Sequence, residues 1–355
     1  MERSISPRVW VAMVGVPIAI VALAIGLFFL AHARSESVPP VWTAADLPTP
    51  PSPEENGAVP LAAHPVRGIP EAIGDLVNAR GETSALEVYR DRRDELAREA
   101  TDRGGDIQRA RVLLDRPRLA MDCASFGGRC DIIGIVSAAD LVALGILADP
   151  IEGRLDPALR DAAGLLERAD DLARDALSHT EWRVGIRVLE TAVAVAEVLS
   201  AEVLSAEVLS AEVLSGEAGA QDERERGEAT LRAAVRAVME RGPPRLDSAV
   251  RAEYVELYAV CETSEGWRFA RGATEMELAA RYVPIERFAR GEGPLPAPPP
   301  EREGWFWEFN REGQMLTSAG MLGDPETVER YVEHTQEIMT RLAEVQRRLD
   351  ARELR

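Results

Sequence analysis

An uninterrupted apolar run near the N-terminus constrains this chain more than any other feature. The run Val9–Leu30 contains 22 residues and no charged side chain. A helix of that length reaches about 33 Å, enough to cross the hydrocarbon core of a bilayer. Pro17 lies inside the run, where a helix in lipid tolerates a proline at the cost of a kink. The run therefore predicts one transmembrane helix over residues 9–30.

Charges on either side of the run predict its orientation. Arg3 and Arg8 precede it with Glu2 as the only acid there, whereas acids dominate the residues after Arg34. Basic residues are retained on the cytoplasmic side of a membrane. We therefore expect residues 1–8 in the cytoplasm, and a single-pass protein of the cell inner membrane whose C-terminal body lies in the periplasm.

A cleaved signal peptide is the alternative interpretation of the same run. Ala31-His32-Ala33 has the small-x-small pattern of a cleavage site, and residues 1–8 fit the charged start of a signal sequence. The apolar run is longer than the about 7–15 residues usual in such a signal, which favours a retained anchor. Both interpretations export the body.

The composition limits the partners of that body. The chain has 355 residues, a net charge of −19 and 46% hydrophobic residues, and all 41 basic residues are arginine. This hydrophobic content suffices for a core in one large domain or two small ones. An acidic body argues against nucleic acid, whose phosphates require a basic surface. It also argues against a body that lies flat on anionic lipid.

Proline dominates the segment between the apolar run and the body. Ser35–Ile69 carries eight prolines. Proline fixes φ and removes a hydrogen-bond donor, so such a segment favours extended, mostly unstructured chain. We expect residues 31–69 to form a linker that lifts the body off the membrane, and residues 70–355 to form the extracytoplasmic domain.

The patterns after Pro70 predict an all-α fold, an irregular antiparallel helical bundle. Ser84 and Glu87 have the spacing of a capping box, and Asp156-Pro157 is typical of a helix start. Gly153–Leu159 resembles the junction between the helices of a tetratricopeptide unit, but occurs once, so it predicts one antiparallel pair. Helices are expected over 84–100, 107–114, 137–147, 156–178, 181–199, 228–240, 247–263 and 274–290, with a loop over 216–226 and a break at Pro284.

A tandem repeat lengthens one of these helices. Four copies of AEVLS occupy residues 196–215. Five residues turn a helix by about 500°, so successive copies are rotated by about 140° and share no face. A binding surface needs one stripe, so we interpret the repeat as a helix lengthened by duplication.

Deleting two of the AEVLS copies should therefore leave folding intact, because no continuous stripe depends on them. Expression level and helical content by circular dichroism measure this outcome. Collapse of expression would contradict the interpretation.

The last predicted helix, residues 324–352, has the clearest pattern. Asp324 and Pro325 are typical of a cap and a first turn. Residues follow at alternating spacings of three and four, as in a coiled-coil seam: Val328, Tyr331, Thr335, Ile338, Leu342, Val345 and Leu349. Packing of this seam on the protein's own core is the favoured interpretation. The alternative is self-association, or a protein partner, bound through the helix.

Two clusters leave alternatives open. Trp305–Phe309 concentrates four of the eighteen aromatic residues. These residues either contact a partner or the membrane interface, or pin the C-terminal segment to the core, which we favour. Cys123 and Cys130 either form a disulfide in an exported chain or are two small buried side chains. Their spacing does not match a zinc motif.

No motif for catalysis, cofactor binding or metal binding is present, so no catalytic, cofactor or metal residue is predicted. His179 and His334 lie in helical patterns and are expected to be solvated or packed. Asp170-Asp171 is expected on an exposed helix face. The favoured function is a membrane-anchored helical scaffold or protein-interaction module. The alternative is an exported hydrolase with a carboxylate-based site, which requires a pocket that gathers two or more acids.

The residues Phe309-Asn310-x-x-Gly313-x-x-Leu316, followed by Tyr331, carry a resemblance. With the anchor, the proline-rich linker and the closing helix, the chain resembles uncharacterised N-terminally membrane-anchored helical proteins of Gram-negative bacteria. The resemblance implies this architecture and no activity. Asn310 and Gly313 are expected to shape the turn into the closing segment.

Overall fold

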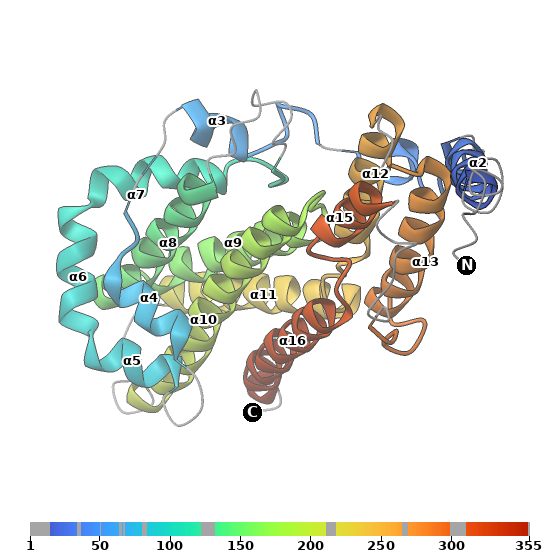
Figure 1. Ribbon diagram of the computed structural model, residues 1–355. Coiled ribbons are helices and arrows are strands. Elements are labelled where there is room, and N and C mark those ends of the chain that lie inside the picture. The colour runs from blue at the N-terminus through green and yellow to red at the C-terminus, as the bar shows by residue number, and fades with distance from the viewer. Residues whose placement is uncertain are drawn as a thin grey trace, which may run out of the picture.

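Every regular element in the described part of the chain is a helix (Figure 1). The computed structural model describes residues 15–33, 37–49, 51–63, 66, 68–79, 84–121, 132–210, 218–264, 269–298 and 310–353. Within these ranges there is no strand, and Asn56 and Arg118 form one isolated bridge. The predicted all-α fold is confirmed.

Four long helices form the central bundle: α9 (Leu155–Arg174), α10 (His179–Ser210), α11 (Ala218–Arg241) and α16 (Pro325–Glu353). Helix α10 contacts α9 and α16, and α11 contacts the same two helices. Helices α9 and α11 run parallel, because Asp156 lies beside Gly227 in their N-terminal halves and Asp170 pairs with Arg241 near their C-terminal ends. The bundle is therefore mixed rather than antiparallel, since the first and third helices of an up-down-up series are neighbours.

Helix α8 (Ile132–Ala148) packs against α9 and α10 and is almost entirely buried. With the turn that follows, Ile132–Glu152 is the one described helical stretch long and apolar enough to cross a membrane, and 83% of its apolar 18-residue window is buried within the protein. It is a core helix. Shorter helices contact or surround it: α3 (Ala58–Ala63), α4 (Glu71–Asn78), α5 (Ala85–Asp91), α6 (Arg93–Asp102) and α7 (Gly104–Ala110).

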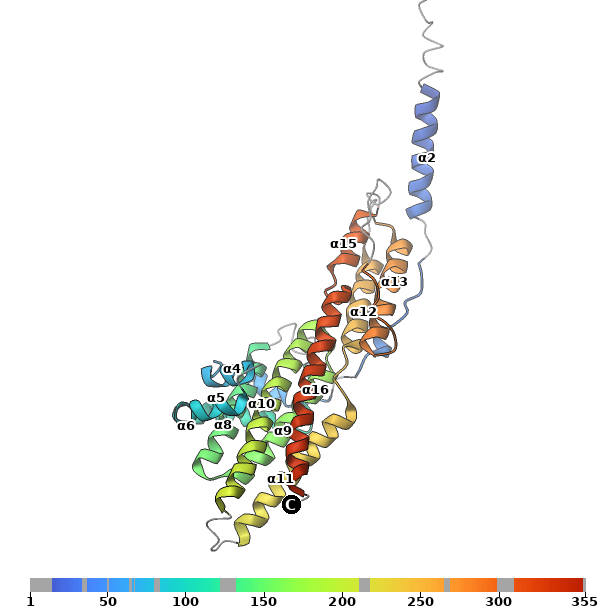
Figure 2. The same ribbon diagram turned by 90° about the horizontal axis from the view of Figure 1, so that it is seen from below.

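Helix α2 (Val16–Ala33) projects away from the body (Figure 2). The side chains of residues 15–26 are all exposed. The apolar stretch of α2 with described side chains, Val16–Gly26, is shorter than a membrane span. Residues 9–14 lie outside the described part of the chain, so the span over 9–30 stays a prediction.

The proline-rich segment packs on the body, which the expectation of an unstructured linker did not anticipate. Asn56 is buried, and its side-chain amide donates a hydrogen bond to the Ala120 carbonyl oxygen at 2.8 Å. Ala58 and Leu61 of α3 belong to the hydrophobic core. Burial of these apolar side chains offsets the entropy lost on ordering the segment. The expectation of an unstructured linker is therefore wrong for the described residues 51–63.

Several helix boundaries differ from the predicted ones. The capping box of Ser84 and Glu87 is confirmed. Asp156 is not a cap, because α9 already begins at Leu155. Helix α12 (Asp247–Thr263), by contrast, begins and ends as predicted. Helix α11 begins at Ala218, so the loop predicted over 216–226 is wrong for its described residues.

Pro284 lies inside α13 (Arg271–Ala289) and does not interrupt it. Proline there removes one backbone hydrogen bond. Tyr282 and Ile285, on either side, are buried in the core. Burial of these two side chains stabilises the helix on both sides of Pro284 and offsets the loss of one backbone hydrogen bond.

The seam of α16 is buried against the bundle, so its packing on the protein's own core is confirmed. Arg341 fixes the register beside the seam, because its guanidinium pairs with Glu197 of α10 at 2.7 Å. Glu197 belongs to the first AEVLS copy, whose Val198 and Leu199 are also buried. The deletion predicted above should therefore remove copies from 206–215. Self-association, or binding of a protein partner, through the helix over residues 324–352 stays a prediction.

Asn310 and Gly313 fix where α15 (Arg311–Ala319) begins. The Asn310 Oδ1 atom accepts a hydrogen bond from the backbone N–H of Ala270 at 2.8 Å, at the start of α13. A Cβ at Gly313 would overlap the side chain of Thr274 on α13. The two residues therefore join the first turns of α13 and α15, in agreement with their expected role in the turn.

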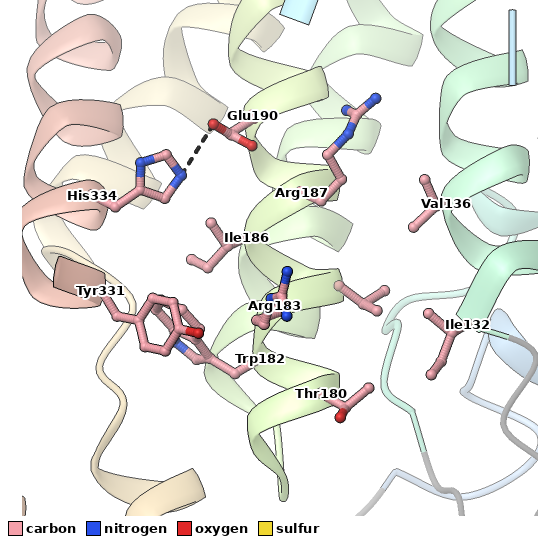
Figure 3. Close-up of a pocket in the computed structure, with 11 residues that line it drawn as sticks. Ile132, Val136, Thr180, Trp182, Arg183, Ile186, Arg187, Glu190, Tyr331 and His334 are labelled. Atoms are coloured by element: carbon pink, nitrogen blue, oxygen red, sulfur yellow. Dashed lines mark ion pairs between the residues drawn. The ribbon is translucent and has the colours of Figure 1, made fainter. Parts of the chain in front are cut away.

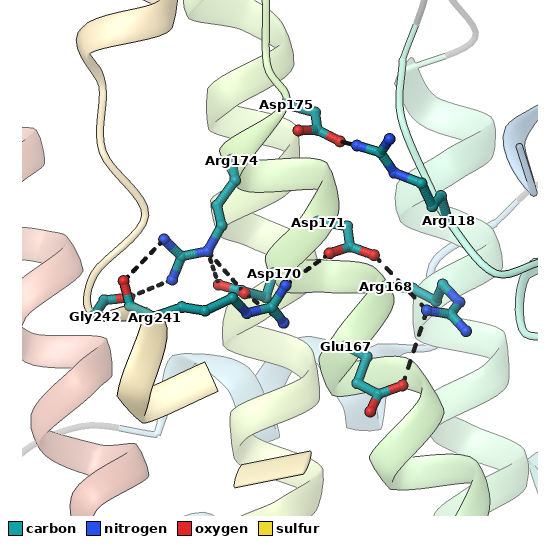
Figure 4. Close-up of polar contacts among 9 residues, drawn as sticks. All are labelled: Arg118, Glu167, Arg168, Asp170, Asp171, Arg174, Asp175, Arg241 and Gly242. Carbon is teal, nitrogen blue, oxygen red and sulfur yellow. Dashed lines mark hydrogen bonds and ion pairs between the residues drawn. The ribbon is translucent and has the colours of Figure 1, made fainter. Parts of the chain in front are cut away.

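A buried ion-pair network joins the C-terminal ends of α9 and α11 (Figure 4). The Asp170 side chain is fully buried and lies 2.8 Å from guanidinium nitrogens of both Arg174 and Arg241. Burial raises the pKa of this carboxyl, and the two arginines act in the opposite direction. Arg174 also donates to the carbonyl of Gly242. The expectation that Asp170 and Asp171 lie on an exposed helix face is therefore wrong for Asp170.

Helices α9 and α10 approach most closely at Gly185. A Cβ placed there would lie 2.5 Å from the Cα atom of Ala173 on α9. Backbone cannot give way as a flexible side chain can. The crossing therefore requires glycine at this position.

Gly185→Ala should lower the free energy of unfolding by about 1–3 kcal/mol, because overlap outweighs the gain in helix propensity of about 1 kcal/mol. Gly164→Ala on α9 is the matched control, since its Cβ would lie 3.6 Å from Leu114, an ordinary contact. This control should be neutral or stabilise by about 0.5–1 kcal/mol. Denaturant unfolding measures the free energy of unfolding of both variants. Equal stability of the two would contradict the close backbone contact between α9 and α10 at Gly185.

Candidate functional site

One face of α10 forms the floor of an open groove between α8 and α16 (Figure 3). Its volume is about 520 Å3, within the range of about 300–1,000 Å3 typical of ligand sites. Apolar side chains from two helices line much of it: Ile132 and Val136 from α8, with Val184 and Ile186 from α10. We call this feature the α10 groove.

The α10 sequence explains the polar part of the groove. Thr180, Arg183, Arg187 and Glu190 follow at spacings of three, four and three, so they share one face of the helix. The remaining faces of α10 pack on α9 and the core. This polar stripe in an apolar helix is the sequence feature that indicates the groove, although it matches no known motif.

The two arginines of the stripe differ in their surroundings. Arg187 lies 3.1 Å from Asp140, a buried carboxylate on α8, and also contacts Thr191. Burial raises the pKa of Asp140, while Arg187 and Thr191 lower it. Arg183 is exposed, and no residue in the described ranges forms an ion pair with it. Arg183 therefore has its guanidinium available to a ligand, whereas the charge of Arg187 is balanced within the protein.

His334 and Glu190 connect α16 to α10 at the edge of the groove. The His334 Nε2 atom lies 3.1 Å from a carboxylate oxygen of Glu190, as drawn in Figure 3. His334 is partly exposed and Glu190 is buried. His334 is therefore packed against Glu190 and partly exposed, within the expected range of solvated or packed environments. Among the described residues that line the groove, Glu190 is the one carboxylate.

An aromatic cluster closes one end of the groove. The His179 Nε2 atom lies 2.6 Å from the Tyr331 hydroxyl, and the Trp182 ring lies 4.9 Å from the Tyr331 ring, centroid to centroid. These contacts fasten the start of α10 to α16. Burial lowers the pKa of His179, and the charge of Arg183 lowers it further. His179 is therefore packed and favours its neutral form.

The described residues in and near the groove offer few nucleophiles and metal ligands. In the groove as described, hydroxyls come only from Thr180 and Tyr331, and Tyr331 is engaged with His179. No group of three or more His, Cys, Asp or Glu side chains that could hold a metal occurs in the described residues. Cys261 is buried, which raises the pKa of its thiol to about 11. Such a thiol is a poor nucleophile.

Some predicted features cannot be placed. Cys123, Cys130 and Trp305–Phe309 lie outside the described residues. The disulfide and the role of the aromatic run therefore stay predictions.

Comparison of the chain with models of protein families, with curated proteins and with solved structures finds no match. The resemblance to membrane-anchored helical proteins stays a prediction. The interpretation of the α10 groove rests on its geometry.

The lowered pKa of His179 predicts a pH effect on stability. The unfolded chain binds the proton more readily than the folded one, so the stabilising contribution is complete above the unfolded pKa of about 6.5 and is lost as the pH falls through it. The wild type should therefore lose more unfolding free energy between pH 7.5 and pH 5.5 than His179→Gln. Denaturant titrations at both pH values measure this difference. The same loss in both proteins would contradict it.

Proposed function

We propose that this protein is a membrane-anchored extracytoplasmic helical scaffold that binds an amphipathic helix of a partner protein in the α10 groove. The observation that carries the proposal is an open groove with apolar walls and an exposed Arg183 that forms no ion pair with any described residue. The proposal keeps α8 and α9, the helices on either side of the Gly153–Leu159 junction, as a tetratricopeptide-like pair, which their packing against each other supports.

The isolation of α2 supports the anchor. Its described side chains are all exposed, with Val16, Ile18 and Leu23 more than half exposed, and none belongs to the hydrophobic core. Exposed apolar surface of this kind is typical of membrane or partner contact. The charge bias around the apolar run favours a periplasmic body, at the inner membrane.

The shape of the groove supports a helical ligand. Figure 3 shows α16, α10 and α8 side by side, so a further helix can lie over α10 between its neighbours. Helices bind in such grooves through apolar residues at i, i+3, i+4 and i+7. An acidic side chain on the same face would reach Arg183. The net charge of −19 repels acidic partners at long range, so we expect this acid in a helix that is otherwise neutral or basic.

The alternative of an exported hydrolase gains no support from the groove. A carboxylate-based site requires two acids near one substrate. Asp140 lies behind Arg187 and pairs with it, so Glu190 is the one acid that lines the groove among the described residues. We therefore retain the scaffold as the proposed function.

The binding proposal is tested with a display library of amphipathic helical peptides selected against the full chain in lipid nanodiscs. We expect selected peptides to carry one Asp or Glu beside an apolar stripe. Arg183→Glu should weaken their binding by about tenfold or more, the size of a charge-assisted contact of about 1.5–3 kcal/mol. Replacing the peptide acid by arginine should restore binding to this variant.

Arg347→Glu is the matched control, because Arg347 is an exposed arginine near the far end of α16, with 74% side-chain exposure. It should leave binding unchanged. Equal losses in Arg183→Glu and Arg347→Glu, or no rescue by the reversed peptide, would contradict the groove. Recovery of a chain that begins after Ala33 and is soluble at alkaline pH would contradict the anchor alone.

A further inference from the structure

Residues 37–46, which we call the strap, follow α2 and are bound to the hairpin of α12 and α13. The Val38 backbone N–H donates to a carboxylate oxygen of Glu275 at 2.6 Å, and the Ser37 hydroxyl donates to the other oxygen at 3.3 Å. The Tyr258 hydroxyl donates to the Val38 carbonyl. Both the backbone N–H and the backbone carbonyl of Val38 are therefore hydrogen-bonded to the hairpin.

Further contacts fasten the next residues of the strap. The Val41 backbone N–H donates to the Tyr254 hydroxyl at 3.1 Å, and the Trp42 ring packs edge-on against Tyr254 at 5.2 Å between centroids. Glu275 is fully buried and also pairs with Arg271 at 2.7 Å. Release of the strap would leave this buried carboxylate with fewer hydrogen bonds, which would raise the free energy of the folded protein. The strap is an integral part of the body.

The position of the strap limits how far the body can lie from α2. Helix α2 ends at Ala33, and the bound strap begins at Ser37. Four residue steps span at most about 14 Å, whatever conformation the link adopts. The hairpin end near Glu275 therefore lies close to the C-terminal end of α2, as Figure 2 also shows. A long, mobile linker is absent between these two points.

Exposed apolar side chains gather around the same end of the body. Val260 near the end of α12, Met276 near the start of α13 and Met315 on α15 are 41%, 55% and 65% exposed. Methionine adapts its shape to irregular apolar surroundings. The guanidinium of Arg271, which pairs with Glu275, also lies 3.5 Å from the exposed carboxylate of Glu262.

We propose that this end of the body rests on the membrane surface, with Val260, Met276 and Met315 in the headgroup region of an electrically neutral bilayer. The inference depends on the proposed role of α2 as an anchor. The short link holds the surface at the bilayer, and the acidic body favours neutral over anionic lipid. The body is thereby held upright on the membrane, at a fixed distance from it.

Photo-crosslinking of the full chain in phosphatidylcholine nanodiscs tests this proposal. A benzophenone amino acid replaces Met276 or Met315, and Arg347, near the other end of the body, is the control position. We expect lipid adducts at least fivefold more abundant at the two methionine positions than at Arg347, by mass spectrometry.

A second variant leaves the body unchanged and lengthens the link. An insertion of about 20 Gly and Ser residues after Ser35 adds a flexible coil of about 25 Å. The adducts at both methionine positions should fall at least fivefold. Adducts no more abundant than at Arg347, or adducts that survive the insertion, would overturn the proposal. A chain that fails to enter nanodiscs would instead contradict the anchor.

Discussion

The close contact between α9 and α10 at Gly185 is the constraint on which the rest of this structure depends. Because the two backbones touch there, α10 lies deep in the body and contacts α8 on one side and α16 on another. Val188–Leu199 of α10 are buried almost without exception. The long C-terminal helix α16 then buries its seam mainly against α10 and α11. The fold is thus organised around a central helix that is apolar on most of its faces.

The α10 groove follows from this arrangement. Helices α8 and α16 both contact α10, yet the strip of α10 between them keeps a polar stripe instead of a further helix. Arg187 of this strip faces Asp140 and Glu190 faces His334, whereas Arg183 forms no ion pair with any residue in the described ranges. In the proposed function, such a surface would recognise a ligand by its shape and by one charge.

Local patterns predicted the parts of the structure that local chemistry determines. The all-α fold, the capping box at Ser84 and the buried seam of α16 follow from spacing and propensity within one segment. The strap, by contrast, depends on Glu275, which lies 237 residues from Val38 in the sequence. Proline content indicates a lack of regular structure but not a lack of contacts. No local pattern could predict this docking.

The same limit applies to charged residues and to the site. Asp170 and Asp171 are adjacent in sequence, yet Asp170 is buried because Arg241 of another helix reaches it. The polar stripe of α10 was visible, but its meaning required knowledge of which neighbours leave that face open. Burial of a charge and the opening of a groove are both properties of tertiary packing. Sequence spacing alone does not determine them.

Hydrogen exchange of the full chain tests the central role of α10 most directly. If α10 organises the fold, the backbone amides of 188–199 exchange only through global unfolding and are the slowest in the chain, while those of α12 and α13 exchange faster through local opening. Exchange of 188–199 as fast as that of α12 and α13 would contradict the account.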